Sequence, residues 1–129
     1  MENTKFPSMV QLAQEWLLPF LHPGAVAVDA TMGNGGDTLF LAQQVGSEGQ
    51  VYAFDVNPLA VQRTRAKLEQ AGQTNVRYIQ SSHENLGQVV NRPIQAAMFN
   101  LGYLPGGEDK RQCTRAVSTL GAVAQAVYL

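Results

Sequence analysis

The sequence predicts an α/β fold of the doubly wound, Rossmann-like type with a mostly parallel sheet. Short apolar segments typical of buried strands alternate with segments of helical period, and the strand-like segments lie at residues 25–30, 50–55, 76–80 and 94–100. A glycine-rich turn, residues 31–37, follows the first of them. This alternation implies parallel strands with helices on both faces and a ligand site at the carboxyl ends of the strands.

Composition places the chain among single folded domains. Its 129 residues carry a net charge of −1, and 45% of them are hydrophobic and 15% charged, which excludes disordered, collagen-like and coiled-coil chains. We expect one domain, residues 1–129, with a packed core. The single cysteine, Cys113, suits a reducing compartment, and neither a signal-peptide pattern nor an apolar stretch of membrane-spanning length is present in the sequence. The sequence therefore predicts a cytoplasmic protein without membrane contact.

Charge is unevenly distributed along the chain. Residues 1–59 hold one basic and six acidic residues, whereas residues 60–115 hold eight basic and four acidic residues. Such an asymmetry occurs in proteins that bind nucleic acids. Solvated helix faces give the same pattern, and composition alone favours that simpler interpretation.

The first predicted element is a helix in an N-terminal helical segment, residues 8–21. Apolar residues recur with a 3.6-residue period from Met9 to Leu18. Ser8 and Gln11 form a capping-box pattern at the start of this helix, and Pro19 ends it.

An incomplete Rossmann-like core, residues 25–129, follows, with helices between its strands. We expect one helix at about residues 38–45 and a weaker one at about residues 83–90. The helix between them has Asn57 as its N-cap and ends at Gly72.

The end of the chain predicts a last helix at about residues 114–128. Its apolar residues share one helical face, namely Val117, Leu120, Ala124 and Val127. A helix in this place would leave the edge of the fourth strand uncovered, which is a liability for aggregation. Two explanations stay open: the chain is a fragment whose C-terminal strands are missing, or it completes its sheet with another chain, as in a homodimer.

The glycine-rich turn is the first candidate site. Asp29 ends the strand before it, and Gly33 and Gly35 allow the backbone to approach a ligand near the exposed amides of the next helix. The dinucleotide template Gly-x-Gly-x-x-Gly lacks its third glycine, because Thr38 stands there, and this counts against NAD. A tight strand-to-helix corner is the simpler alternative.

Polar residues also end the second and third strands. Asp55 lies 20 residues after Gly35, where a carboxylate can accept hydrogen bonds from both hydroxyls of a ribose. Asn57 can contact an adenine edge, cap the next helix, or do both. Ser82 and His83 follow the third strand over the same crevice and can line an adenine pocket, and a cap or surface position is the alternative for His83.

The fourth strand ends at the motif Asn100-Leu101-Gly102-Tyr103. An Asn side-chain oxygen and neighbouring backbone carbonyls can accept hydrogen bonds from an amine and hold its lone pair toward an electrophile. Tyr103 can stack on a flat substrate. The alternative is an ordinary turn with Tyr103 in the core or at its rim.

Together these segments resemble a class I S-adenosylmethionine-dependent methyltransferase. The run from Asp29 to Gly35 is similar to the first motif of that superfamily with Thr31 in place of its first glycine, and Asn100-Leu-Gly-Tyr103 is similar to the Asn-Pro-Pro-Tyr motif of amino-group methyltransferases. More narrowly, residues 8–128 resemble the bacterial rRNA methylase family, now associated with tRNA 5-(aminomethyl)-2-thiouridine methyltransferases. The segments that carry this resemblance are DATMGNGGDTLFLA, VYAFDVNPLAV, SSHENL and FNLGYLPGG. Members of that family continue with the remaining strands of a seven-stranded sheet.

The resemblance implies a role for each candidate residue and no metal. The residues implied to bind S-adenosyl-L-methionine are Asp29, Gly33, Asn34, Gly35, Gly36, Asp55, Asn57, Ser82 and His83. Asn100 and Tyr103 are the implied catalytic residues, and Leu101 and Gly102 the implied substrate contacts. The implied reaction is N-methylation of the aminomethyl group on a tRNA wobble uridine. An rRNA or small-amine substrate, and a non-catalytic module that binds an adenosyl ligand, are the alternatives.

Three basic residues flank the implied substrate motif, namely Lys110, Arg111 and Arg115. Phosphate contacts of this kind position an RNA without reading its bases. We expect them to hold a tRNA anticodon stem-loop. His83 and Asp109 are candidate proton acceptors, and neither is assigned that role.

Overall fold

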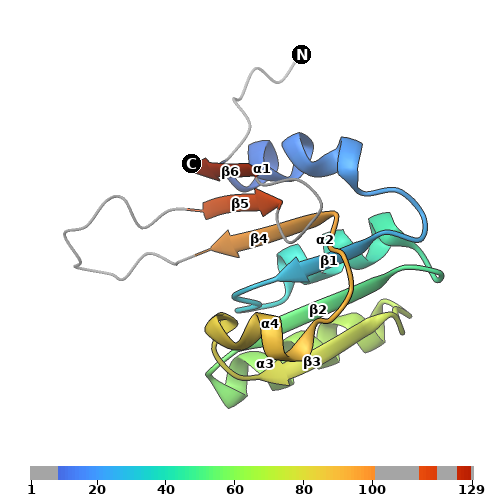
Figure 1. Ribbon diagram of the computed structural model, residues 1–129. Coiled ribbons are helices and arrows are strands. Elements are labelled where there is room, and N and C mark those ends of the chain that lie inside the picture. The colour runs from blue at the N-terminus through green and yellow to red at the C-terminus, as the bar shows by residue number, and fades with distance from the viewer. Residues whose placement is uncertain (1–8, 101–113, 119–124, 129) are drawn as a thin grey trace, which may run out of the picture.

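The computed structural model describes residues 9–100, 114–118 and 125–128, with side chains for residues 11–99. Within them one six-stranded sheet has the order β3-β2-β1-β4-β5-β6 (Figure 1). Its strands are β1 Val26–Asp29, β2 Gln50–Asp55, β3 Val76–Gln80, β4 Ala96–Asn100, β5 Thr114–Ser118 and β6 Gln125–Tyr128. The first four strands pair in parallel, and β5 and β6 pair in antiparallel fashion. The predicted doubly wound, mostly parallel fold is confirmed.

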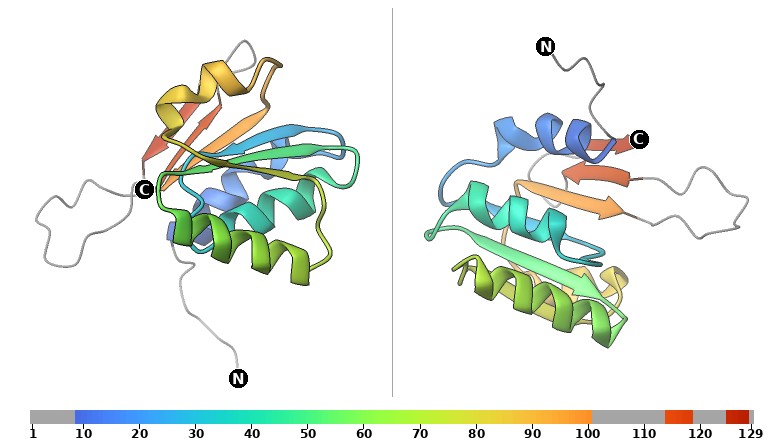
Figure 2. Two further views of the ribbon diagram at one scale, coloured as in Figure 1. Left: turned by 90° about the horizontal axis from the view of Figure 1, so that it is seen from below. Right: turned by 180° about the vertical axis from the view of Figure 1, so that it is seen from behind.

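Helices cover both faces of this sheet, and most of them lie on one face (Figure 2). The helical elements are α1 Met9–Leu17, η1 Leu18–Phe20, α2 Gly36–Val45, α3 Pro58–Gln70, η2 His83–Asn85 and α4 Leu86–Val89. The weak helix expected at residues 83–90 is thus a 3-10 turn followed by the short α4. The longest of these helices, α3, has 13 residues, and no helix in the described part of the chain has the length and apolarity to cross a membrane.

Two apolar cores fix the sheet between its layers. The larger core joins Leu17 of α1, Leu41 of α2 and Leu68 of α3 to the sheet. The smaller one packs Phe54 of β2 and Ile94 under α4. All four residues of β1 are buried, and each large side chain that is removed from water stabilises the fold by about 1.5–3 kcal/mol. Strand β1 is therefore held firmly in the core, and its pairing with β2 and β4 fixes where those two strands end.

The C-terminal segment differs from the prediction. The helix expected at residues 114–128 is wrong, because Thr114–Ser118 and Gln125–Tyr128 are strands. Strand β5 pairs with β4, with Ala97 opposite Val117, so the edge of β4 that we expected to be bare is covered. The short apolar runs of this segment fit the helical period of 3.6 residues as well as the strand period of two. A glycine inside a helix destabilises it by about 1 kcal/mol relative to alanine. The open edge of β4 offers backbone hydrogen-bond partners to an extended segment, and this pairing favours strands over a helix.

Candidate functional site

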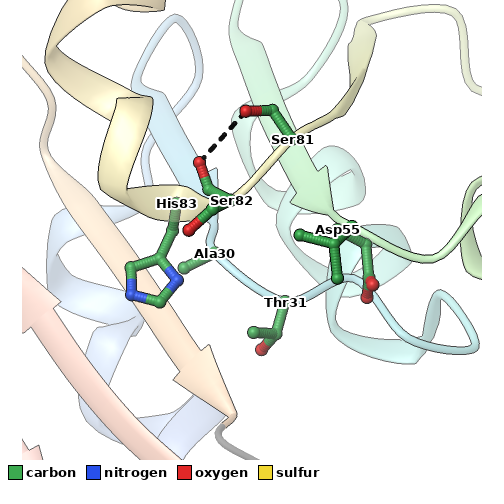
Figure 3. Close-up of a pocket in the computed structure, with 7 residues that line it drawn as sticks. Ala30, Thr31, Asp55, Ser81, Ser82 and His83 are labelled. Atoms are coloured by element: carbon green, nitrogen blue, oxygen red, sulfur yellow. Dashed lines mark hydrogen bonds between the residues drawn. The ribbon is translucent and has the colours of Figure 1, made fainter.

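A pocket of about 240 Å³ opens where β1, β2 and β3 end (Figure 3). Its lining residues are Ala30, Thr31, Asp55, Val56, Ser81, Ser82 and His83. The structure thereby brings together Asp55, Ser82 and His83, which lie on two separate segments of the sequence. Pockets for whole drug-sized ligands have volumes of about 300–1,000 Å³. The pocket therefore suits a nucleoside-sized part of a larger ligand.

The Asp55 carboxylate is fixed at the wall of this pocket by two backbone amides. The Gly33 N–H donates to Oδ2 at 3.0 Å, and the Asn57 N–H donates to Oδ1 at 3.0 Å. Each carboxylate oxygen has two lone pairs, so each can accept one further hydrogen bond. A pair of neighbouring hydroxyls, as on a ribose, matches this acceptor pair.

Asn57 has the helix-capping role that was one of its two expected roles. Its side-chain Oδ1 accepts a hydrogen bond from the Leu59 N–H at 2.9 Å at the start of α3. The residue is exposed and does not line the pocket. The adenine contact stays a prediction.

The glycine-rich turn packs closely against α3. Gly35 has φ +92°, and a Cβ there would lie 3.1 Å from the Thr64 Cα. The Thr64 hydroxyl donates to the Gly33 carbonyl at 3.2 Å. On the other side of the turn, Asn34 Oδ1 accepts from the Gly36 N–H at 3.1 Å, which holds the first amide of α2. A tight strand-to-helix corner thus accounts for a glycine at position 35. The ligand contacts expected for Gly33, Asn34, Gly35 and Gly36 stay predictions.

Asp29 lies beneath the turn rather than at its surface, with 0% of its area exposed. Its Oδ2 accepts from the Thr38 hydroxyl at 2.6 Å, and its Oδ1 accepts from the Thr31 N–H at 3.2 Å. Burial raises the pKa of the Asp29 carboxyl from 3.8 to about 8, against the opposing effect of the Thr38 hydrogen bond. These two hydrogen bonds give Asp29 a supporting role in the turn, and the direct cofactor contact expected for it stays a prediction.

A second acid links α2 to the N-terminal helix. Gln14 Nε2 on α1 donates to Asp37 Oδ1 at 3.0 Å. Burial raises the pKa of the Asp37 carboxyl, and the hydrogen bond from Gln14 lowers it. Among the described residues, the charges that act on Asp29 are those of Asp37 and Asp55. Three carboxyl groups therefore surround one turn, and each has a different environment.

The segment after β3 forms a preorganised wall of the pocket. Asn85 Nδ2 donates to Ser81 Oγ at 2.7 Å, and Ser82 caps η2 through its hydroxyl oxygen. The His83 ring packs edge to face on Phe99, with 5.1 Å between ring centroids and 88° between planes. The wall is thus joined to β4 one residue before Asn100.

Strand register places Asp55 and Asn100 at the same edge of the sheet. Asp29 pairs with Ala53 on β2 and with Met98 on β4. Asp55 and Asn100 therefore lie two residues past the same point, on the two strands that flank β1. Neighbouring strands are about 4.8 Å apart, so their backbones are about 10 Å apart with the end of β1 between them.

The remaining substrate-side predictions are not tested by side-chain geometry. The described side chains end before Asn100, and the predicted residues outside the described part are Leu101, Gly102, Tyr103, Lys110 and Arg111. The backbone of Arg115 lies in β5 opposite Phe99. Their proposed roles rest on the sequence.

Sequence reasoning missed four lining residues, namely Ala30, Thr31, Val56 and Ser81. Each lies one or two residues after the end of a strand. This position in the sequence could have identified them as lining residues. Val56 is apolar and yet 66% exposed, so it offers an apolar rim at the pocket. Within the described residues, no three His, Cys, Asp or Glu side chains come together as metal ligands.

The known proteins that this chain resembles are methyltransferases. Residues 51–129 match the family model described as "Putative rRNA methylase". The chain is 36% identical over 117 residues to the chloroplastic tRNA (mnm(5)s(2)U34)-methyltransferase of Arabidopsis thaliana, covering 82% of this chain and 42% of that protein. It is 33% identical over 92 residues to ribosomal RNA small subunit methyltransferase H 2 of Alkaliphilus metalliredigens, covering 67% of this chain and 26% of that protein.

A solved structure matches the fold as well. A crystal structure described as "a putative methyltransferase" from Streptococcus mutans in complex with SAH has a TM-score of 0.70 and 42% identity. The match covers 81% of this chain and 58% of that chain. The chain thus spans less than half the length of the two curated relatives and a little over half of this structure.

Proposed function

Because the chain belongs to the rRNA methylase family of class I S-adenosylmethionine-dependent methyltransferases, we propose that it binds S-adenosylmethionine and transfers its methyl group to an RNA. One observation carries the proposal. The Asp55 carboxylate, held by the Gly33 and Asn57 amides, lines a nucleoside-sized pocket at the carboxyl ends of parallel strands. Ligands of doubly wound folds bind at that edge.

The residues of the pocket fit the nucleoside part of this cofactor. Asp55 would accept hydrogen bonds from the two ribose hydroxyls, and the exposed Val56 side chain at the rim of the pocket would contact the flat base. Ser82 and His83 form the opposite wall. The bound cofactor supplies a methyl group on a positively charged sulfur, and the role of these residues is to fix its nucleoside end.

We assign the amine acceptor to the end of β4. The register brings Asn100 to the edge that carries Asp55, and its side-chain oxygen with the Leu101 and Gly102 carbonyls orients the amine toward the methyl group. Tyr103 stacks on the base of the substrate. The amine must be neutral to react. With a lysine-like pKa of about 10.4, deprotonation at pH 7.5 costs about 4 kcal/mol, and a dry pocket supplies most of this by depressing the pKa of an amine.

The proposed substrate is the aminomethyl group of 5-aminomethyl-2-thiouridine at a tRNA wobble position. The name of the Arabidopsis relative supports this substrate class, and the identity of 36% supports a common ancestor. An rRNA is the second candidate, which the Alkaliphilus relative favours. Methyl incorporation into tRNA with and without the aminomethyl group, and into rRNA, distinguishes the two. A cytoplasmic location and a homodimer stay predictions.

Cofactor binding is the first experiment. We expect calorimetry to show that the chain binds S-adenosylmethionine and S-adenosylhomocysteine, and that its affinity for NAD is far lower. Asp55→Asn should weaken both adenosyl ligands 10- to 100-fold, because a hydrogen bond to a charged group contributes about 1.5–3 kcal/mol. Glu48→Gln changes an exposed carboxylate before β2 and is the matched control. A preference for NAD would overturn the proposal.

RNA binding is the second experiment. Replacing Lys110, Arg111 and Arg115 together with Ala should weaken tRNA binding and flatten its dependence on salt, because phosphate contacts release counterions. The control removes the same charge elsewhere, from the exposed Arg63, Arg77 and Arg92. Equal losses in both triple variants would show that the effect is net charge and not a contact near the proposed substrate site.

A further inference from the structure

Thr64 is a buried polar residue in the middle of α3, and its hydroxyl is used outside its own helix. The residue is 0% exposed, so its hydroxyl depends on a partner within the protein. A threonine inside a helix commonly bonds to the carbonyl three or four residues earlier. The Thr64 hydroxyl donates to the Gly33 carbonyl oxygen at 3.2 Å, which is 31 residues away in the sequence. This bond joins α3 to the glycine-rich turn.

Gly33 links Thr64 to Asp55. Its carbonyl accepts from Thr64, and its own N–H donates to Asp55 Oδ2 at 3.0 Å. Gly33 has φ +54°, and glycine has the largest backbone freedom of all residues, so hydrogen bonds at both of its peptide groups restrict its orientation. The three residues form one chain of hydrogen bonds from the interior of α3 to a carboxylate that lines the pocket.

Helix α3 thereby holds both oxygens of that carboxylate. Asp55 Oδ1 accepts from the N–H of Asn57, which is the N-cap residue of α3. Asp55 Oδ2 is held through Gly33 by Thr64, further along the same helix. The turn approaches α3 closely enough for this bond, since a Cβ on Gly35 would lie 3.2 Å from the Thr64 hydroxyl oxygen. One helix therefore orients the whole carboxylate.

We propose that Thr64 is a positioning residue for ligand binding: it fixes Gly33 so that Asp55 presents its carboxylate to the two hydroxyls of a ribose. The inference rests on the proposed function, because it takes Asp55 as the residue that binds the ribose. Thr64 is not among the residues that line the pocket, so its effect on the ligand passes through Gly33. An acceptor that is already oriented binds more tightly, because less conformational freedom is lost on binding.

Removal of the Thr64 hydroxyl tests this role. Thr64→Val keeps the β-branched shape and lacks the hydroxyl. In calorimetry with S-adenosylhomocysteine, its affinity should be about 3- to 10-fold lower than that of the wild type, since a neutral hydrogen bond contributes less than one to a charged group. Thr64→Ser keeps the hydroxyl and should restore most of the affinity. Thr64→Ala also lacks the hydroxyl, has high helix propensity, and should repeat the loss if Thr64→Val fails to fold.

A double-mutant cycle with Asp55→Asn separates positioning from a general loss of structure. If Thr64 acts through Asp55, Thr64→Val should change the affinity much less in the Asp55→Asn chain than in the wild type. Val61→Ala is the matched control, because Val61 lies on the same helix and packs against the apolar cluster around Ala53. It should lower the free energy of unfolding in urea and leave the affinity for S-adenosylhomocysteine nearly unchanged.

The ribose itself gives a second readout. The wild type should bind adenosine more tightly than 2′-deoxyadenosine, because only adenosine offers two neighbouring hydroxyls to Asp55. Thr64→Val should reduce this preference, and Val61→Ala should keep it. A preference that is the same in the wild type and in Thr64→Val would overturn the inference.

The outcomes separate this inference from the proposed function. If the wild type binds neither S-adenosylmethionine nor S-adenosylhomocysteine, the proposed function fails. If the wild type binds them and Asp55→Asn weakens binding while Thr64→Val does not, only the role of Thr64 is overturned. An equal loss from Thr64→Val in the wild-type and Asp55→Asn chains would also overturn it, because Thr64 would then act independently of Asp55.

Discussion

Asp29→Asn should stabilise the fold at neutral and alkaline pH and change it little near pH 4. The folded state holds the pKa of Asp29 at about 8, mainly through burial, against 3.8 for an exposed carboxyl. Between these two values the folded chain keeps a proton that the unfolded chain has lost, so the free energy of unfolding falls as pH rises. At about 1.4 kcal/mol per pKa unit, the full loss above pH 8 is on the order of 5 kcal/mol as an upper bound. This is a large fraction of the 5–15 kcal/mol that is typical of a domain.

Urea unfolding at pH 4.5, 6, 7.5 and 8.5 measures this effect. The free energy of unfolding of the wild type should fall relative to that of Asp29→Asn as pH rises through this range. Glu48→Gln, which changes an exposed carboxylate, should run parallel to the wild type at every pH. Parallel curves for the wild type and Asp29→Asn would refute the reasoning, because they would mean that Asp29 is ionised in the fold at no cost.

Three further substitutions test the turn, the cap and the acceptor side. Gly35→Ala should cost at least about 2 kcal/mol of unfolding free energy in urea titrations, because it adds a contact with the backbone of Thr64 to the strain of positive φ. Gly72→Ala has similar φ strain and open space around it, so equal losses would refute the packing argument. Asn57→Ala should cost about 1 kcal/mol by loss of the N-cap bond, and Asn57→Asp should restore it. Asn100→Ala should lower turnover and leave cofactor affinity in calorimetry nearly unchanged, whereas equal losses of both would place Asn100 on the cofactor side.

The strands and helices around the pocket were predictable because local signals agree with the tertiary structure there. The residues expected at 50–55 and 76–80 are strands β2 and β3 with the same bounds. The cap at Asn57 set the start of α3 correctly. Parallel strands end at one edge, so acids and hydroxyls that follow strands meet in one pocket. The position of the pocket was therefore predictable from the strand ends.

Two features depend on contacts that the sequence does not display. Strand β5 exists because β4 offers an open edge to it, and this pairing is not visible in the period of residues 114–128. Burial of Asp29 depends on the packing of the turn over it, since Asp29 and Asp55 both end a strand and only Asp29 is fully buried. The sequence therefore predicted similar roles for two carboxyls that differ in burial and in hydrogen-bond partners.

These different environments of Asp29 and Asp55 depend on the register between β1 and β2. The register places Ala53 opposite Asp29 and thereby sets Asp55 two residues beyond the buried acid. The paired residues begin at the amino ends of the two strands, where Gln50, directly after Gly49, pairs with Val26. A Cβ on Gly49 would lie 2.5 Å from the Val45 Cβ and 2.6 Å from the Ala25 carbonyl oxygen, so only glycine fits directly before β2. A strand of six residues spans about 20 Å, and a one-residue slip would exchange the two faces of the strand. The chemistry at the carboxyl edge thus depends on close packing at the amino edge, which neither acid contacts.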